Sequence, residues 1–220
     1  LLISRADESA PAEIESACNR ILADREILAT LVALEEAGAT VRYHSMDVRD
    51  TKALGGLVDR LYADYDRIDG VLHGAGIIED KLMRHKTTDS FERVFDTKVM
   101  AALTLAEKLR SDVSFVVFFS SVSGAFGNRG QVDYAAANEA LDKIALSLNE
   151  RVDGRVLSIN WGPWAGAGMV HEELEREYAR RGIGLIAPTG GVSSFVDELL
   201  IHDVNCPQVI LMRAAPDSLQ

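Results

Sequence analysis

A serine, a tyrosine and an asparagine stand close together in residues 115–138. The apolar run 115–119 has the length of a buried strand and ends in two serines. The second of these is Ser121, which would lie at the carboxyl edge of a parallel sheet. Tyr134 and Asn138 are four residues apart, so they share one face of a helix. A serine that hydrogen-bonds a carbonyl oxygen suits a tyrosine that gives that oxygen a proton as it gains charge.

A lysine occupies a position that the preceding helix should fill with an apolar side chain. Over residues 90–109 the inward stripe of the expected helix consists of Phe91, Phe95, Lys98, Ala102, Leu105 and Leu109. Burial of an ammonium group without a partner costs free energy, so Lys98 stands out. Because a free tyrosine has a pKa of about 10, Tyr134 needs a nearby cation to act at neutral pH. Lys98 is the candidate for that cation.

The spacing of these four residues resembles that in the ketoreductase domains of polyketide and polyunsaturated fatty acid synthases. Among these, the iterative synthases look most similar in sequence. These domains are a branch of the short-chain dehydrogenase/reductase superfamily. Most of that superfamily carries a lysine four residues after the tyrosine. The synthase ketoreductases have asparagine there and lysine on the earlier helix, and Asn138 and Lys98 follow that exchange. The resemblance covers nearly the whole chain and includes residues 71–76 (Val-Leu-His-Gly-Ala-Gly) and 159–164 (Ile-Asn-Trp-Gly-Pro-Trp).

The resemblance implies that NADPH reduces a 3-oxoacyl thioester, held on an acyl carrier protein, to the 3-hydroxyacyl thioester. Tyr134 would donate the proton and Ser121 would hold the carbonyl oxygen. Lys98 would lower the pKa of the tyrosine, and Asn138 would orient Lys98 or a relay water. The implied partners are the carrier protein, with its phosphopantetheine-linked chain, and other synthase domains of the same polypeptide. Cys18 and Cys206 are too few for a disulfide framework, so a cytoplasmic protein with reduced thiols is expected.

Two other functions stay open. The chain could be a free-standing dehydrogenase of the same superfamily that acts on another ketone. The exchanged Lys98 and Asn138 and the turn at 161–164 argue against that function. It could also be a catalytically silent, ketoreductase-like scaffold that packs against neighbouring synthase domains. The intact set of four residues argues against silence.

Strand patterns alternate with helix patterns along the chain, which predicts an α/β fold with a parallel sheet and helices on both faces. Strands are expected at residues 1–4, 41–46, 69–72, 115–119, 155–161 and 208–212. Helices are expected at 21–37, 51–65, 90–109, from 134 onward, at 171–181 and at 192–202, the last capped by Thr189, while 7–19 should form a surface insertion. The resemblance implies a Rossmann-like, doubly wound sheet of order 3-2-1-4-5-6-7 within one ketoreductase domain, residues 1–220.

The glycine-rich phosphate turn of this fold is not in the sequence. No Gly-x-Gly-x-x-Gly stands between a strand and a helix. The family places that turn just before the strand that residues 1–4 represent. We therefore expect the first β-α unit to be absent from this chain, which would leave the domain incomplete at its N-terminus.

Several strand ends carry candidates for binding the dinucleotide. Ser4 and Arg5 end the first strand, where an arginine accommodates the 2′-phosphate of NADP; a solvated loop arginine is the alternative. The resemblance assigns Asp47 and Val48 to the adenine pocket, whereas the alternative for Asp47 is the N-cap of the helix at 51–65. Further cofactor-binding candidates implied by the resemblance are Gly74, Ala75, Gly76, Gly162 and Pro163, together with Lys98 and Tyr134.

The resemblance also indicates residues that meet the substrate. In ketoreductases that form the (3R) alcohol, the stretch after the glycine turn resembles Leu-Asp-Asp, and its last residue corresponds to Asp80. Reductases of the opposite hand carry tryptophan eight positions before the tyrosine, where this chain has Phe126. A (3R) product is therefore expected. Gln131, Trp164 and Met169 are further substrate-side candidates, and residues 166–187 are expected to form a lid, with a surface helix as the alternative.

Composition excludes several other classes of function. The 220 residues, 47% of them hydrophobic, suffice for one domain with a sizeable core. A net charge of −11 argues against general nucleic-acid binding, and the apolar runs are too short for a membrane helix. No set of His, Cys and carboxylate residues has metal-ligand spacing. Lys81, Arg84 and Lys86 form a short basic cluster, expected to be a solvated helix face and, failing that, the surface that meets an acidic carrier.

Overall fold

The computed structural model describes residues 11–166, 178–180, 182–201 and 206–214. The chain divides into two compact units, Leu1–Ser45 and Met46–Gln220. The expected strand at 1–4 lies outside the described residues.

The first unit contains one long helix. Helix α1 (Pro11–Glu36) begins ten residues before the expected start and takes in most of the expected surface insertion. Its end is as expected: Gly38 adopts a φ of 88°, and the N–H of Ala39 bonds to the carbonyl of Leu34, which closes the last turn. The predicted strand at 41–46 is wrong, because the structure has no strand there. An extended segment becomes a strand only where a neighbour pairs with its N–H and C=O groups.

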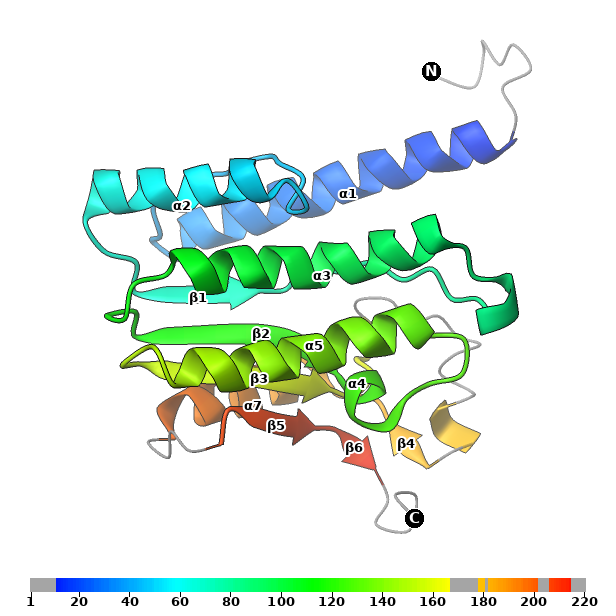
Figure 1. The fold of residues 1–220 in the computed structure, drawn as a ribbon. Coiled ribbons are helices and arrows are strands. Elements are labelled where there is room, and N and C mark those ends of the chain that lie inside the picture. The colour runs from blue at the N-terminus through cyan, green and yellow to red at the C-terminus, as the bar shows by residue number, and fades with distance from the viewer. Residues whose placement is uncertain (1–10, 167–177, 181, 202–205, 215–220) are drawn as a thin grey trace. The chain divides into compact units, whose positions relative to one another are not determined.

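The second unit is built on a parallel sheet (Figure 1). Its strands are β1 (Gly70–His73), β2 (Phe115–Ser121), β3 (Arg155–Trp161) and β5 (Gln208–Leu211), in the spatial order β1-β2-β3-β5. All three pairings are parallel. This order corresponds to the 4-5-6-7 half of the expected sheet, whereas the 3-2-1 half has no counterpart among the described residues. A small antiparallel pair is formed by β4 (Ile183–Gly184) and β6 (Arg213–Ala214).

Helices cover both faces of the sheet (Figure 1). Helices α2 (Thr51–Tyr65), α3 (Thr88–Lys108) and α5 (Val132–Asn149) pack on one face, around Val116, Phe118 and Val156 of the strands. Helix α7 (Pro188–Leu200) packs on the other face, against Val117, Leu157 and Ile159. The alternation of buried side chains along β2 and β3 follows from the two-residue period of a strand covered on both faces. The expected α/β architecture is therefore confirmed for this unit.

The N-terminal ends of two helices differ from the prediction. Asp50, rather than Asp47, caps α2, because its side chain accepts a hydrogen bond from the N–H of Ala53. Thr189 does not cap α7 either. That helix starts at Pro188, whose fixed φ and missing N–H suit the first helical position. Two short helices, η2 (Met83–His85) and α4 (Val122–Phe126), were not predicted.

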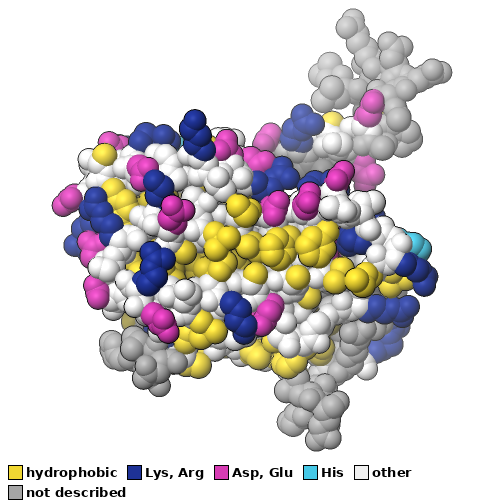
Figure 2. All heavy atoms as spheres, viewed as in Figure 1, with side chains coloured by type: hydrophobic (Ala, Val, Ile, Leu, Met, Phe, Trp, Pro, Cys, Tyr) yellow, Lys and Arg dark blue, Asp and Glu magenta, His cyan; other side chains and the backbone are white. Residues whose placement is uncertain are grey.

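Charges of both signs are interspersed on the face that carries α3 and α5, with an apolar strip between them (Figure 2). A shallow groove on this face is lined by Leu103, Ala106, Glu107, Ile144, Ser147, Leu148 and Arg151. Among the described residues, no helix is both long and apolar enough to cross a membrane.

Candidate active site

A cavity of about 220 Å³ opens at the carboxyl ends of β1, β2 and β3. Parallel strands end together at one edge of a sheet, which is where ligands bind in open α/β folds. The cavity is lined by Gly74, Gly76, Ile78, Lys98, Phe119, Ser120, Ser121, Val122, Ser123, Gln131, Tyr134, Trp161, Gly162, Pro163, Trp164 and Tyr178. Three of the four predicted catalytic residues, Lys98, Ser121 and Tyr134, are therefore brought to the same space.

Lys98 reaches the cavity from the buried face of α3. Its residue surface is only 4% exposed, and Nζ donates a hydrogen bond of 2.7 Å to the backbone carbonyl of Phe119. Gly76 makes room for it, since a Cβ at that position would lie 2.8 Å from Lys98 Cε. Burial lowers the pKa of Lys98 from 10.5 to about 8, and the negative charge of Asp142 acts in the opposite direction. The lysine thus stays largely cationic at neutral pH.

Tyr134 faces Lys98 across the cavity. Lys98 Nζ lies 5.6 Å from the centroid of the phenol ring. Burial raises the pKa of Tyr134, while polar contacts with Ser121 and Asn138 work against that rise. The phenol is therefore protonated at neutral pH and can act as a proton donor. Ser121 ends β2 and starts α4, where its Oγ accepts a hydrogen bond of 3.2 Å from the N–H of Ser123.

Asn138 lies one turn after Tyr134 and is fully buried. Its Nδ2 donates a hydrogen bond of 2.7 Å to the carbonyl of Tyr134. Its Oδ1 has no hydrogen-bond partner among the described residues. Gly124 of α4 packs directly on this residue, because a Cβ there would lie 3.0 Å from Asn138 Cβ. The predicted inward face of this helix is confirmed by the burial of Asn138, Leu141, Ala145 and Leu148.

The glycine turns that were expected to meet a cofactor lie on the cavity wall. The cavity is lined by Gly74, Gly76, Gly162 and Pro163. Ala75 lies between the first two of these in the sequence. A Cβ on Gly74 would meet no atom within 4 Å, so this glycine leaves open space that a ligand could fill. These turns therefore fit a flat ligand that approaches the backbone closely.

The other candidates for binding the cofactor that the structure describes are not among the residues that line the cavity. The carboxylate of Asp47 forms an ion pair with Arg49, at 2.7 Å between Oδ2 and Nη2, and this contact lowers the pKa of Asp47 to about 2. Val48 packs against the core of the second unit. Ser4 and Arg5 lie outside the described residues.

The substrate-side candidates fall into four groups. Gln131 and Trp164 line the cavity. Asp80 lies behind Gln131 and accepts a hydrogen bond of 2.9 Å from its Nε2. Phe126 is not among the lining residues and is 62% exposed, so its role stays a prediction. Met169 and most of the expected lid lie outside the described residues.

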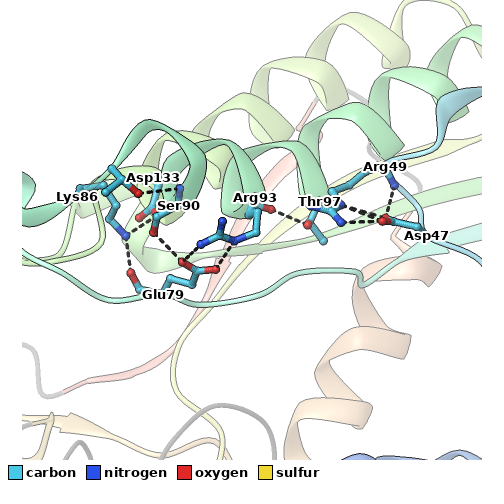
Figure 3. Close-up of polar contacts among 9 residues, drawn as sticks. Asp47, Arg49, Glu79, Lys86, Ser90, Arg93, Thr97 and Asp133 are labelled. Carbon is cyan, nitrogen blue, oxygen red and sulfur yellow. Dashed lines mark hydrogen bonds and ion pairs between the residues drawn. The ribbon is translucent and has the colours of Figure 1, made fainter. Parts of the chain in front are cut away.

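A network of charges holds the 77–82 loop, which carries Asp80, against α3 and α5 (Figure 3). The carboxylate of Glu79 accepts hydrogen bonds from Arg93 Nε at 2.8 Å and Ser90 Oγ at 2.7 Å. Those two contacts lower the pKa of Glu79 to about 2. Lys86 Nζ bonds both the backbone carbonyl of Glu79 and the carboxylate of Asp133, the latter at 2.6 Å.

Lys86 is therefore not part of a solvated basic face. The side chains of Lys86 and Asp133 are 4% and 1% exposed, so they form a buried ion pair. The prediction of a solvated cluster is wrong for this residue, while Lys81 and Arg84 are exposed. Sequence reasoning missed the pair because its partners are 47 positions apart. The signal that was available is Asp133 itself, an acid directly before the tyrosine.

His73 is a packed core residue. It is 5% exposed, its Nε2 contacts the carbonyl of Lys98 at 2.9 Å, and burial lowers its pKa to about 4. It is therefore neutral at neutral pH, and its ring fixes the backbone of α3 at Lys98.

Comparison with known proteins identifies the family. The KR domain family matches residues 2–166 of the chain. The chain belongs to the KR domain family. It is 36% identical, over 187 residues, to one subunit of the polyunsaturated fatty acid synthase of Thraustochytrium sp. (strain ATCC 26185 / S-3). It is 34% identical, over 200 residues, to the polyketide synthase PksN of Bacillus subtilis (strain 168). These alignments cover 84% and 87% of the chain but only 6% and 4% of those synthases.

Solved structures of ketoreductases have the same fold as this KR chain. An N-terminal ketoreductase from the macrolactin assembly line matches with a TM-score of 0.77 and 30% identity, over 89% of this chain and 38% of its own. A ketoreductase domain from the bacillaene assembly line gives 0.76 and 32%, over 86% of this chain and 46% of its own. A short-chain dehydrogenase from Streptomyces avermitilis, 19% identical with a TM-score of 0.71, shares the fold. That likeness shows the fold alone.

Proposed function

We propose that this KR chain reduces a 3-oxoacyl thioester on an acyl carrier protein to the (3R)-3-hydroxyacyl thioester, with NADPH as the reductant. The observation that carries the proposal is the meeting of Lys98, Ser121 and Tyr134 around one cavity at the sheet edge. Family membership supports the same reaction, since the matched solved structures are described as ketoreductases.

The cavity residues fit a nicotinamide cofactor. The backbone at Gly74 and Gly76 would take the ribose, and the turn at Gly162 and Pro163 would take the nicotinamide. NADPH, when bound, supplies the hydride that is added to C3 of the ketone. An arginine at position 5 supports the choice of NADPH over NADH, because a guanidinium pairs well with the 2′-phosphate.

The side chains have separate tasks in the proposed reaction. Ser121 Oγ donates a hydrogen bond to the ketone oxygen and so fixes it near Tyr134. Tyr134 gives that oxygen its proton as negative charge develops there. Lys98 is a buried cation beside the phenol, so it stabilises the phenolate that is left behind. Asn138 has a free buried Oδ1, among the described residues, which suits a water that returns a proton to Tyr134.

The partners follow from the substrate. The thioester would arrive on the phosphopantetheine arm of a carrier protein, with the chain acting as one domain of a larger synthase. The curated relatives are such synthases, of which this chain spans a small part. With Lys86 buried, Lys81 and Arg84 are the exposed basic residues that we propose for meeting an acidic carrier.

The decisive experiment replaces Tyr134 by phenylalanine. Tyr134→Phe should lower kcat for NADPH-dependent reduction of a 3-oxoacyl thioester by at least about 100-fold, because the proton donor is lost. The loss of NADPH absorbance measures the rate, and the same assay with NADH tests the choice of cofactor. Tyr43→Phe, at an exposed tyrosine, is the matched control and should be as active as the wild type.

Each rival function has its own outcome in this assay. A wild-type protein that binds NADPH but reduces no ketone would be the silent scaffold. A wild type that prefers simple ketones to 3-oxoacyl thioesters would be a free-standing dehydrogenase. Near-normal turnover by Tyr134→Phe would contradict the proposed proton transfer.

A further inference from the structure

A buried carboxyl group lies beneath the cavity, between α5 and the sheet. Asp142 is 0% exposed and belongs to α5, two turns after Tyr134. It accepts hydrogen bonds from Ser158 Oγ, from Asn160 Nδ2 at 2.8 Å and from Gln208 Nε2 at 3.0 Å. Burial raises the pKa of Asp142, and the hydrogen bonds from Asn160 and Ser158 act against that rise. All three partners, from strands β3 and β5, are donors, so the ionised carboxylate is the form that this environment satisfies.

Asn160 connects this carboxylate to the end of β2. Its Nδ2 also contacts Ser120 Oγ at 3.1 Å and the backbone carbonyl of Ser121 at 3.0 Å. Ser120 Oγ in turn donates to the carbonyl of Asn138, at 3.2 Å. The end of β2 is thus tied to α5 and β3 at the residue that enters the cavity.

Lys98 is anchored to the same three-residue segment. Its Nζ donates to the carbonyl of Phe119, the residue before Ser120. Residues 119–121 therefore make one contact to Lys98, one to Asn138 and two to Asn160. A shift of this segment would move Ser121 and the anchor of Lys98 together.

The orientation of the Asn160 amide depends on Asp142. A side-chain amide has one donating and one accepting end, and neighbouring hydroxyl groups can satisfy either orientation. A carboxylate only accepts, so it requires the Nδ2 end of Asn160 to point toward it. The Oδ1 end then accepts from Gln208 Nε2 at 3.1 Å. The carbonyl of Ser121 requires the same orientation, so loss of the carboxylate removes one of the groups that hold the amide in place and weakens its bond to that carbonyl.

We propose that Asp142 is a positioning residue of the reductase site, which orients Asn160 to hold residues 119–121 and provides a buried negative charge that favours the ammonium form of Lys98. The inference rests on the proposed function, because Ser121 and Lys98 are its proposed working groups. It adds a residue that does not touch the cavity.

Few other charges of the described residues act on Asp142 and Lys98. Glu139 and Lys143 lie on the same helix as Asp142, and they pair with each other at 2.8 Å near solvent. Among the described residues, Asp142 contacts neutral groups of the strands, the charge of Glu139 raises its pKa further, and its own charge acts on Lys98 of α3. Lys98 faces neutral His73 from β1 and neutral Tyr134 from α5. Removing the charge of Asp142 should therefore lower the pKa of Lys98 further.

The test is Asp142→Asn in the full protein, which keeps the shape and removes the charge. We expect kcat at pH 7 to fall about ten- to a hundred-fold, with KM for the thioester little changed. The alkaline limb of the pH–kcat profile should move by about one unit to lower pH, since Lys98 loses its proton earlier. Glu139→Gln removes the same charge from the same helix near solvent, and it should leave both quantities unchanged.

A second readout does not depend on activity. Carbon-13 NMR of labelled lysine side chains, with the Lys98 signal assigned by its loss in Lys98→Met, gives the pKa of Lys98 directly. This pKa should be lower in Asp142→Asn than in the wild type. If Asp142→Asn does not fold, Ser158→Ala removes one donor only and should shift the same pKa in the same direction, by less.

Two results would overturn the inference. One is an Asp142→Asn protein that is less stable but has an unchanged alkaline limb and an unchanged Lys98 pKa, because the role of Asp142 would then be structural only. The other is an equal shift in Glu139→Gln, which would mean that general charge is responsible. An inactive wild type would contradict the proposed function instead, and the NMR titration would still test the inference.

Discussion

At the scale of single residues, Lys98 shows a conflict between stability and chemistry. Its folded-state pKa of about 8 lies below the ordinary value of 10.5. Between these two pH values the unfolded chain binds more protons than the folded protein, so this residue makes stability rise with pH there. Below pH 8 the full cost of burying the charge is present. A core position would be better filled by an apolar side chain.

We therefore predict that Lys98→Met stabilises the protein at pH 7 while lowering its reductase activity. The difference between the two pKa values corresponds to a free-energy cost of about 3 kcal/mol for burying the charge. Loss of the bond to the Phe119 carbonyl offsets part of it, so a net gain of roughly 1–2 kcal/mol is expected. Urea unfolding measures the difference, which should shrink as the pH rises from 8 toward 10.5. A variant that is less stable than the wild type at pH 7 would contradict this account.

At the scale of elements, the structure shows how the 77–82 loop is held beside the cavity. The loop contacts α3 through Glu79, the start of α5 through Lys86, and Gln131 through Asp80. Asp133 also accepts a hydrogen bond from the N–H of Tyr134 at 2.9 Å. The buried pair of Lys86 and Asp133 therefore links the loop to the first turn of the helix that presents Tyr134.

Breaking that pair should be costly. In Lys86→Met the carboxylate of Asp133 stays buried without its partner, which typically lowers the free energy of unfolding by about 3–5 kcal/mol. Lys81→Met removes the same charge from an exposed position and should change it by less than about 0.5 kcal/mol. Urea unfolding of both variants makes the comparison. Equal stability of the two would mean that Lys86 is solvated after all.

At the scale of the whole molecule, the site exists because three parallel strands end at one edge. Ser121 is the last residue of β2, the turn at Gly162 follows β3, and the glycine turn at 74–76 follows β1. On one side the cavity is bounded by Ser123 and Gln131, which are joined by a hydrogen bond of 2.9 Å and backed by Asp80. Trp161 and Trp164 bound another part, with ring centroids 4.7 Å apart. In the proposed reaction, a substrate arm that enters along one of these sides would present one face of its ketone to the nicotinamide.

The proposed (3R) stereochemistry of the product can be tested at the contact between Gln131 and Asp80. An unsubstituted 3-oxoacyl thioester should give mainly the (3R) alcohol, as measured by chiral chromatography. Gln131→Leu removes the contact with Asp80 and should lower the ratio of (3R) to (3S) product by roughly five-fold, since a loss of about 1 kcal/mol has that effect. Leu146→Ala, at an exposed side chain of α5 outside the cavity lining, should leave the ratio unchanged. Mainly (3S) product from the wild type would mean that Asp80 does not select the hand.

The sequence by itself determined the elements whose pattern is local. Strand β3 and helix α2 have the predicted bounds, and β2 and α3 differ from them by two residues or fewer at each end. The alternation of strands and helices is enough to predict a parallel sheet. The cavity residues Lys98, Ser121 and Tyr134 could be found because a charge on an apolar stripe and a polar strand end both break a regular pattern.

Only the tertiary structure decided which groups pair across the chain. Lys86 reads as one more surface lysine in the sequence, yet it is buried against an acid 47 positions away. Asp142, Ser158 and Asn160 look like isolated polar residues until α5 packs on β3. The stretch at 41–46 has a strand-like pattern but pairs with no strand among the described residues. The physical reason is the same in each case: hydrogen bonds and charge burial depend on the partner, and a partner far along the chain leaves no periodic signal.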